Sequence, residues 1–330
     1  LKVHPSELYF TGSGTEANNL AIQGITSTPH FRTHPGHLVT TVIEHPSVLN
    51  VMKHLETLGW TVTYLDVNEE GQIDLTQFQE SLRPETKLVS VMMVNNEIGS
   101  ILPIEEIGKI IQEANNLRSS KIVFHVDAVQ ALGQVPVNVP ALGADLMTFS
   151  GHKLFGPKGI GLLYARRGTK LRPILFGGGQ ERGIRPGTEN MPGIVGLTKA
   201  IQIAVQDLEP NTKHIAELRA QLISGVKEIE HSFINSPENG APHILNIGFE
   251  GIRGEVLVHF LEQRRIFVSM GAACSSKRRT SHVLEAIGLP DEKILESIRI
   301  SLAPNITQDQ IRYVVSSLGD TVEQIRRIYM

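Results

Sequence analysis

The sequence predicts an α/β fold: a larger domain with a mostly parallel sheet flanked by helices, followed by a smaller α+β domain. Three observations support this prediction. Between residues 1 and 165, short β-branched runs alternate with longer helical patterns, as in parallel strands joined by crossover helices. The run Val89–Val94 is apolar on both faces, as expected of a strand in a sheet covered on both sides. The length of 330 residues, 41% of them hydrophobic, suits about two domains with sizeable cores.

Strands and helices alternate through the first part of the chain. The expected strands are Glu7–Phe10, His37–Ile43, Thr61–Leu65, Lys87–Val94, Ile122–Val126, Asp145–Ser150 and Gly161–Ala165. The expected helices are Glu16–Ile25, Ser47–Leu58, Leu75–Leu82 and Ile104–Asn115.

A domain boundary is expected near residue 208. The glycine-rich region Gly177–Gly193 interrupts the alternation, and a long helix, Ile194–Leu208, then ends before Pro210. We therefore predict a large domain at 1–208 and a small domain at 209–330. The small domain is expected to contain helix, strands, helix, strand and helix in that order.

Composition excludes several classes of protein. The formal net charge of -3 argues against a dedicated nucleic-acid binder, and no apolar run approaches the roughly 18 residues of a membrane span. The single cysteine, Cys274, cannot form an internal disulfide, a zinc site of the Cys-x-x-Cys kind or an iron–sulfur site within the chain. No metal site is predicted. A reducing cytoplasm is the expected compartment.

The turn after the first predicted strand, Gly12-Ser13-Gly14-Thr15, has the composition of an anion site. Free backbone N–H groups and the positive end of the following helix favour a phosphate there. The same residues also read as a short dinucleotide fingerprint, although the acidic residue expected about 20 positions later is absent. A NAD-dependent oxidoreductase therefore stays an alternative.

Other chemically active side chains follow four further predicted strands, where open α/β sheets bind ligands. His45 is placed to stack on a ligand or to move protons, and Asn96 offers an amide. A carboxylate at Asp127 needs a cationic or N–H partner, which a pyridinium nitrogen would supply, and Gln130 follows it. Lys153, in an apolar setting, is a Schiff-base candidate. Singly, each has a structural interpretation; together they are the groups needed to hold pyridoxal 5'-phosphate.

At this level of detail the chain resembles the cysteine desulfurases of the NifS/IscS group, in the class V aminotransferase family of fold-type I pyridoxal-phosphate enzymes. The resemblance covers nearly the whole chain. The matching motifs are Gly14-Thr15-Glu16, Glu44-His45, Asn95-Asn96-Glu97-Ile98-Gly99, His125-Val126-Asp127-Ala128-x-Gln130, Ser150-Gly151-His152-Lys153, Gly156-Pro157-Lys158-Gly159, Glu181-Arg182-Gly183-x-Arg185-x-Gly187-Thr188, Gly271-Ala272-Ala273-Cys274-Ser275-Ser276 and Ile298-Arg299-Ile300-Ser301.

The resemblance implies how the cofactor is held. Lys153 would form the imine with the cofactor aldehyde, and Asp127 would pair with the pyridine nitrogen. Gln130 would contact the ring hydroxyl, and His45 would stack on the ring and assist proton transfers. The phosphate would be held by a set of small polar residues from two strand ends: Gly14, Thr15, Ser150 and His152. Thr188 would reach the phosphate of a neighbouring subunit, which implies a homodimer.

The resemblance also implies the reaction. Asn96 and Arg299 would bind the carboxylate end of L-cysteine. Cys274 would take the sulfur as a persulfide, leaving L-alanine, and pass it to an acceptor protein. The acceptor is expected to be an iron–sulfur scaffold or a tRNA-thiolation enzyme, with no direct contact of this chain to nucleic acid or membrane. The basic stretch after Cys274 departs from the pattern of general iron–sulfur suppliers, which favours a dedicated partner such as a tRNA-thiolation enzyme; the alternative interpretation of the same charges is a solvated face.

Family members carry a segment before the position of Leu1, so an N-terminal segment is expected to be missing from this sequence. Two alternatives stay open beside the NAD-dependent oxidoreductase. One is a related pyridoxal-phosphate lyase or aminotransferase, which would not need Cys274. The other is a non-catalytic partner protein that retains a relic site.

Overall fold

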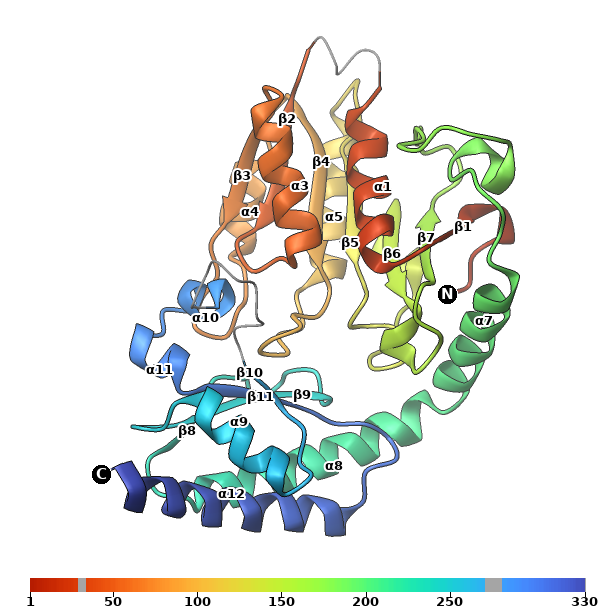
Figure 1. Cartoon of the computed structure of the whole chain (residues 1–330). Helices are drawn as coiled ribbons and strands as arrows, with labels where there is room; N and C mark the ends of the chain where they lie inside the picture. The colour runs from red at the N-terminus through yellow and green to blue at the C-terminus, as the bar shows by residue number, and fades with distance from the viewer. Residues whose placement is uncertain (29–33, 271–280, 330) are drawn as a thin grey trace. The chain divides into compact units, whose positions relative to one another are not determined.

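The computed structural model describes residues 1–28, 34–270 and 281–329 (Figure 1). It forms two compact units. The first contains Leu1–Asp66, Ile73–Val94 and Leu102–Leu208, and the second contains Val67–Gln72, Asn95–Ile101 and Glu209–Met330. Two short segments of the first half of the chain thus belong to the second unit.

The first unit is built on a seven-stranded sheet with the order β1-β7-β6-β5-β4-β2-β3. The strands are β1 (Leu8–Thr11), β2 (His37–Thr41), β3 (Thr61–Leu65), β4 (Thr86–Met92), β5 (Val123–Asp127), β6 (Leu146–Ser150) and β7 (Gly161–Ala165). Strands β2 to β6 pair in parallel, whereas β7 runs antiparallel to both β6 and β1. The prediction of a mostly parallel sheet flanked by helices is confirmed.

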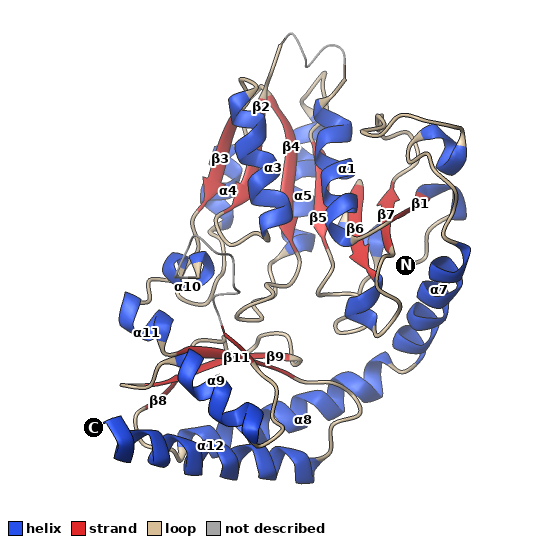
Figure 2. Cartoon of the chain, viewed as in Figure 1, coloured by secondary structure: helices blue, strands red, loops and turns tan. Residues whose placement is uncertain are grey.

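Helices cover both faces of this sheet, with α1 and α3 on one face and α4 and α5 on the other (Figure 2). The helices of the first unit are α1 (Gly14–Thr26), α3 (Pro46–Thr57), α4 (Leu75–Ser81), α5 (Ile104–Asn116), α6 (Val139–Leu142) and α7 (Met191–Gln206). Three short 3-10 helices are η1 (Pro5–Glu7), η2 (Gly151–Leu154) and η3 (Gln180–Gly183). The apolar side of α1, with Ala17, Leu20 and Ala21, belongs to a buried cluster that also includes residues of α3, β2, β4, β6 and β7. This burial fixes the start of α1 at the end of β1.

The second unit has a four-stranded antiparallel sheet with the order β10-β11-β9-β8. Its strands are β8 (Ser232–Ile234), β9 (Ile244–Phe249), β10 (Ser269–Met270) and β11 (Ser297–Ser301), and its helices are α8 (Leu208–Lys227), α9 (Gly254–Gln263), α10 (His282–Ala286), α11 (Asp291–Leu295) and α12 (Gln308–Tyr329). Pro210 lies in the first turn of α8, where its missing N–H costs no helical hydrogen bond.

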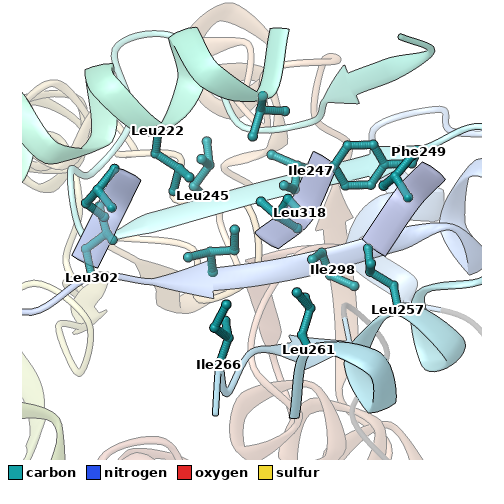
Figure 3. Close-up of a cluster of buried hydrophobic side chains, with 14 of the residues drawn as sticks. Leu222, Leu245, Ile247, Phe249, Leu257, Leu261, Ile266, Ile298, Leu302 and Leu318 are labelled. Atoms are coloured by element: carbon teal, nitrogen blue, oxygen red, sulfur yellow. The ribbon is translucent and has the colours of Figure 1, made fainter. Parts of the chain in front are cut away.

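A hydrophobic cluster joins the helices and strands of this unit. Leu222 of α8, Ile247 of β9, Leu261 of α9, Ile298 of β11 and Leu318 of α12 are all buried in it (Figure 3). Two short helices, α10 and α11, stand where the sequence predicts none.

The described ranges 1–28, 34–270 and 281–329 lack both a membrane-spanning helix and a cluster of metal ligands. In that part of the chain no helix is both long and apolar enough to span a bilayer. The same residues contain no cluster of three or more histidine, cysteine, aspartate or glutamate side chains suited to a metal ion.

Candidate functional site

In the turn between β1 and α1, a carboxylate accepts hydrogen bonds from both sides, and a glycine allows close packing against a neighbouring side chain. Glu16 accepts hydrogen bonds from Gly12 N–H (2.7 Å) and from the Arg185 guanidinium (2.7 Å), while the Ser13 side chain caps α1 by accepting from Glu16 N–H. A Cβ atom on Gly14 would lie 2.9 Å from Val129 Cγ2, so only glycine allows this close approach. The first N–H groups of this 13-residue helix have no acceptor within the helix, and Ser13 caps only that of Glu16, so the start of α1 suits an anion.

The end of β6 adds the next predicted residues. Ser150 lies at the end of β6, with its Cβ 3.2 Å from the position a Gly14 Cβ would take, and its hydroxyl is 3.0 Å from His152 Nδ1. Partial desolvation and the charges of Lys153 and Lys158 lower the pKa of His152, so its ring is neutral at physiological pH. Lys153 is half-buried on η2, directly after these two residues.

Asp127 ends β5 as a buried carboxylate, 5% exposed. Its Oδ1 accepts from Val129 N–H at 3.0 Å and its Oδ2 from Asn18 Nδ2 at 2.7 Å. Burial raises the pKa of Asp127, whereas the hydrogen bonds from Val129 and Asn18 and the nearby His45 act to lower it. The carboxylate therefore accepts a hydrogen bond on each oxygen, and a cationic group nearby would further offset the cost of burying its charge. Gln130 is half-buried in the turn that follows.

His45 is the N-cap residue of α3, directly before Pro46. Its Nδ1 accepts from Ser47 N–H at 3.1 Å and lies 2.8 Å from the Ser47 hydroxyl. Desolvation lowers the pKa of His45, Lys153 lowers it further, and Asp127 acts in the opposite direction. The neutral ring therefore carries its proton on Nε2.

Two buried polar side chains next to these residues were not predicted as site residues. Asn18 of α1 joins Asp127 to Ser47 through its amide group. Glu44, fully buried, accepts from Met92 N–H at 2.7 Å and from the Thr41 hydroxyl at 3.0 Å, and burial raises its pKa to about 8. A polar residue inside the apolar pattern of α1 was the available signal for Asn18.

The second unit brings together the two predicted substrate residues. Arg299 of β11 donates to the Asn96 carbonyl at 2.9 Å and to the Ser269 hydroxyl at 3.3 Å. Glu97 accepts a hydrogen bond from the Ser281 hydroxyl. Burial raises the pKa of Glu97 to about 7, against the opposing effects of the Ser281 hydrogen bond and of the Arg299 charge. A guanidinium held by neutral groups suits recognition of a carboxylate.

Two predicted residues remain. Thr188 is exposed in the glycine-rich segment before α7. Cys274 lies outside the residues that the structure describes.

Comparison with known proteins defines the family. The profile described as "Aminotransferase class-V" matches residues 1–314, and the chain belongs to this family. A curated relative named cysteine desulfurase, from Nostoc sp. (strain PCC 7120 / SAG 25.82 / UTEX 2576), is 45% identical over 98% of this chain and 79% of its own length. A relative named cysteine desulfurase IscS, from Dictyoglomus turgidum (strain DSM 6724 / Z-1310), is 42% identical over 98% of this chain and 80% of its own.

A solved structure described as a NifS-like protein matches with a TM-score of 0.91 and 37% identity, covering 98% of this chain and 84% of that one. These matches confirm the predicted family and the fold of class V aminotransferases.

Proposed function

We propose that the protein is a cysteine desulfurase, a sulfurtransferase that removes sulfur from L-cysteine with pyridoxal 5'-phosphate as cofactor. Two findings support the assignment. Relatives named cysteine desulfurase are 42–45% identical over nearly the whole chain. The strand ends of the first unit present a phosphate cradle, a buried carboxylate, a neutral histidine and a lysine.

The residues of the first unit fit the proposed cofactor. Gly14 keeps open the approach of α1 to Ser150, which a Cβ atom would block, and so leaves helical N–H groups available to a phosphate. Asp127 is a buried carboxylate that a protonated ring nitrogen would neutralise. Gln130, Thr15, His152 and the stacking ring of His45 would complete the set. When bound, pyridoxal phosphate supplies an electron sink for the carbon that carries the amino group.

The protein's own groups then have separate tasks. Asp127 would hold the proton on the ring nitrogen, and Lys153 Nζ would hold the cofactor aldehyde and move protons at the substrate carbon. His45, neutral with its proton on Nε2, would act as a hydrogen-bond donor to the bound cofactor or substrate. Arg299 and Asn96 bind the substrate carboxylate.

Cys274 performs the sulfur transfer. Its thiolate attacks the sulfur of the bound cysteine, so an S–S bond forms while the C–S bond breaks and its electron pair stays with carbon. Protonation of that carbon gives L-alanine and leaves a persulfide on Cys274. Because the chain has one cysteine, the next thiol must come from an acceptor protein, either an iron–sulfur scaffold or a tRNA-thiolation enzyme. A reducing cytoplasm suits this chemistry.

The partner in assembly is a second copy of the chain. Phe176 is 84% exposed and Val195 of α7 is 63% exposed, and Thr188 is exposed in the segment between them. Large exposed apolar side chains are typical of a subunit interface. In the homodimer, Thr188 would reach the phosphate of the neighbouring subunit.

The experiment is to incubate the purified protein with pyridoxal phosphate and L-cysteine and to measure colour, alanine and sulfide. Lys153→Ala should abolish the yellow colour and the products. Cys274→Ala should keep the colour but lose both products. Products retained by Cys274→Ala would instead indicate a lyase or aminotransferase. A colourless protein that binds a dinucleotide would indicate the oxidoreductase. Dimers that form without taking up the cofactor would indicate a relic site.

A further inference from the structure

Asn18 occupies the centre of a buried hydrogen-bond chain. The residue lies in the second turn of α1 with 1% of its surface exposed. Its Nδ2 donates to Asp127 Oδ2 at 2.7 Å and to Ser47 Oγ at 2.8 Å. Ser47 Oγ in turn lies 2.8 Å from His45 Nδ1. One amide nitrogen therefore connects the carboxylate at the end of β5 to the imidazole at the start of α3.

The direction of each hydrogen bond in this chain is fixed. An amide nitrogen only donates, so Asp127 Oδ2 and Ser47 Oγ both accept from Asn18. With its oxygen engaged by Asn18, the Ser47 hydroxyl turns its proton toward His45 Nδ1, which already accepts from Ser47 N–H. The opposite orientation of the amide would bring two acceptors, Asn18 Oδ1 and Asp127 Oδ2, within hydrogen-bond distance.

These directions favour one protonation state at each end. A carboxylate that accepts from Asn18 Nδ2 and Val129 N–H is stabilised in its ionised form. An imidazole Nδ1 whose single lone pair faces both the N–H and the hydroxyl of Ser47 is stabilised without a proton at that atom. Lys153 also acts on this pair by lowering the pKa of His45, and the charge of Asp127 in turn raises the pKa of Glu44.

We propose that Asn18 is a positioning residue that couples Asp127 to His45 through Ser47, keeping Asp127 an ionised acceptor and His45 neutral with its proton on Nε2. This inference rests on the proposed function in one respect, because Asp127 and His45 are the groups that would face the cofactor ring. Asn18 itself, on α1, acts through its hydrogen bonds to Asp127 and Ser47. It links the helix that forms the phosphate cradle to both ring contacts.

Two variants separate the two branches of this hydrogen-bond network, one to Asp127 and one through Ser47 to His45. Asn18→Ala removes the donor to both branches, whereas Ser47→Ala removes only the hydroxyl that points to His45. Asn19→Ala is the matched control, since Asn19 is the neighbouring asparagine on α1 and donates locally to the Thr15 carbonyl. Equilibrium unfolding of all three variants shows whether each one folds.

The primary measurement is made on the cofactor-free protein. The ¹³C chemical shift of the Asp127 carboxyl and the ¹⁵N chemical shifts of the His45 ring are followed against pH. Spectra of Asp127→Asn and His45→Gln identify which signals belong to these two residues. Asn18→Ala should raise the proton affinity of Asp127 about tenfold, the smaller value for one hydrogen bond to a charged group, and that of His45 a few-fold. Ser47→Ala should raise only that of His45, and Asn19→Ala neither.

The second measurement is the dissociation constant of pyridoxal phosphate. Asn18→Ala should weaken binding at least about tenfold, with Asn19→Ala unchanged. Unchanged titrations of Asp127 and His45 in a folded Asn18→Ala variant would overturn the inference. If the Asn18→Ala variant does not fold, the test passes to Ser47→Ala. A Ser47→Ala variant that leaves the titration of His45 unchanged, or that shifts the titration of Asp127 as much as that of His45, would then overturn the inference. Failure of the wild-type protein to take up the cofactor would refute the proposed function while the titrations still decide the role of Asn18.

Discussion

Replacing Glu44 with glutamine removes the titration of a fully buried carboxyl group. The wild-type side chain accepts from Met92 N–H and the Thr41 hydroxyl, and a glutamine oxygen can accept the same two bonds. Burial is the main cause that raises the pKa of Glu44 from 4.5 to about 8, and the nearby Asp127 adds to it. The folded protein therefore holds this proton more tightly than the unfolded chain does.

The sign of the effect on stability follows from this difference. A carboxyl whose pKa is higher in the folded state contributes most below pH 4.5, and its contribution falls as the pH rises toward 8. At about 1.4 kcal/mol per pH unit, the difference corresponds to roughly 5 kcal/mol over the whole range. Relative to Glu44→Gln, the wild-type protein should therefore lose several kcal/mol of unfolding free energy between pH 5 and pH 8.

The assay is urea unfolding of both proteins at a series of pH values. The difference between the two proteins is the quantity to follow, because other groups such as His37, whose pKa burial lowers to about 4, titrate in both. Glu113→Gln, on the exposed side of α5, is the control for replacing a glutamate by glutamine at a site that is not buried. A constant difference between wild type and Glu44→Gln from pH 5 to pH 8 would refute the reasoning.

Two smaller changes test the geometry around the proposed sites. A Cβ atom on Gly161 of β7 would lie 2.5 Å from the Ser13 carbonyl oxygen. Gly161→Ala should therefore lower the unfolding free energy by about 1–3 kcal/mol and weaken cofactor binding. Gly179→Ala is the control and should do neither, because a Cβ atom there would have no atom within 4 Å. Ser281→Ala removes the N-cap of α10 and the hydrogen-bond donor to Glu97. It should lower the unfolding free energy measured in urea by about 1 kcal/mol and raise the pKa of Glu97, measured by ¹³C titration, above about 7. An unchanged Glu97 titration would contradict this.

The strands of the first unit could be predicted because their signals are local. Two of them, Thr61–Leu65 and Gly161–Ala165, have the predicted bounds, and the others differ by one or two residues at their ends. Short β-branched runs between helical patterns are read from neighbouring residues alone. The polar residues at the strand ends were found for the same reason.

The supporting contacts could not be predicted because they join residues far apart in the chain. Asn18 and Asp127 are 109 positions apart, and the Arg185 contact with Glu16 spans 169. The membership of Asn95–Ile101 in the second unit depends on similar contacts, such as Ala241 N–H to the Gly99 carbonyl at 2.7 Å. No local pattern encodes such pairings, so a buried Asn18 reads only as a polar interruption of a helix.

The location of the transferred sulfur tests the central claim most directly. The protein loaded with pyridoxal phosphate is given L-cysteine for a single turnover, and its peptides are then analysed by mass spectrometry alongside the alanine released. The account predicts one added sulfur atom on the peptide that contains Cys274, in equal amount to L-alanine. Alanine formed while Cys274 remains an unmodified thiol, with no acceptor present, would contradict it.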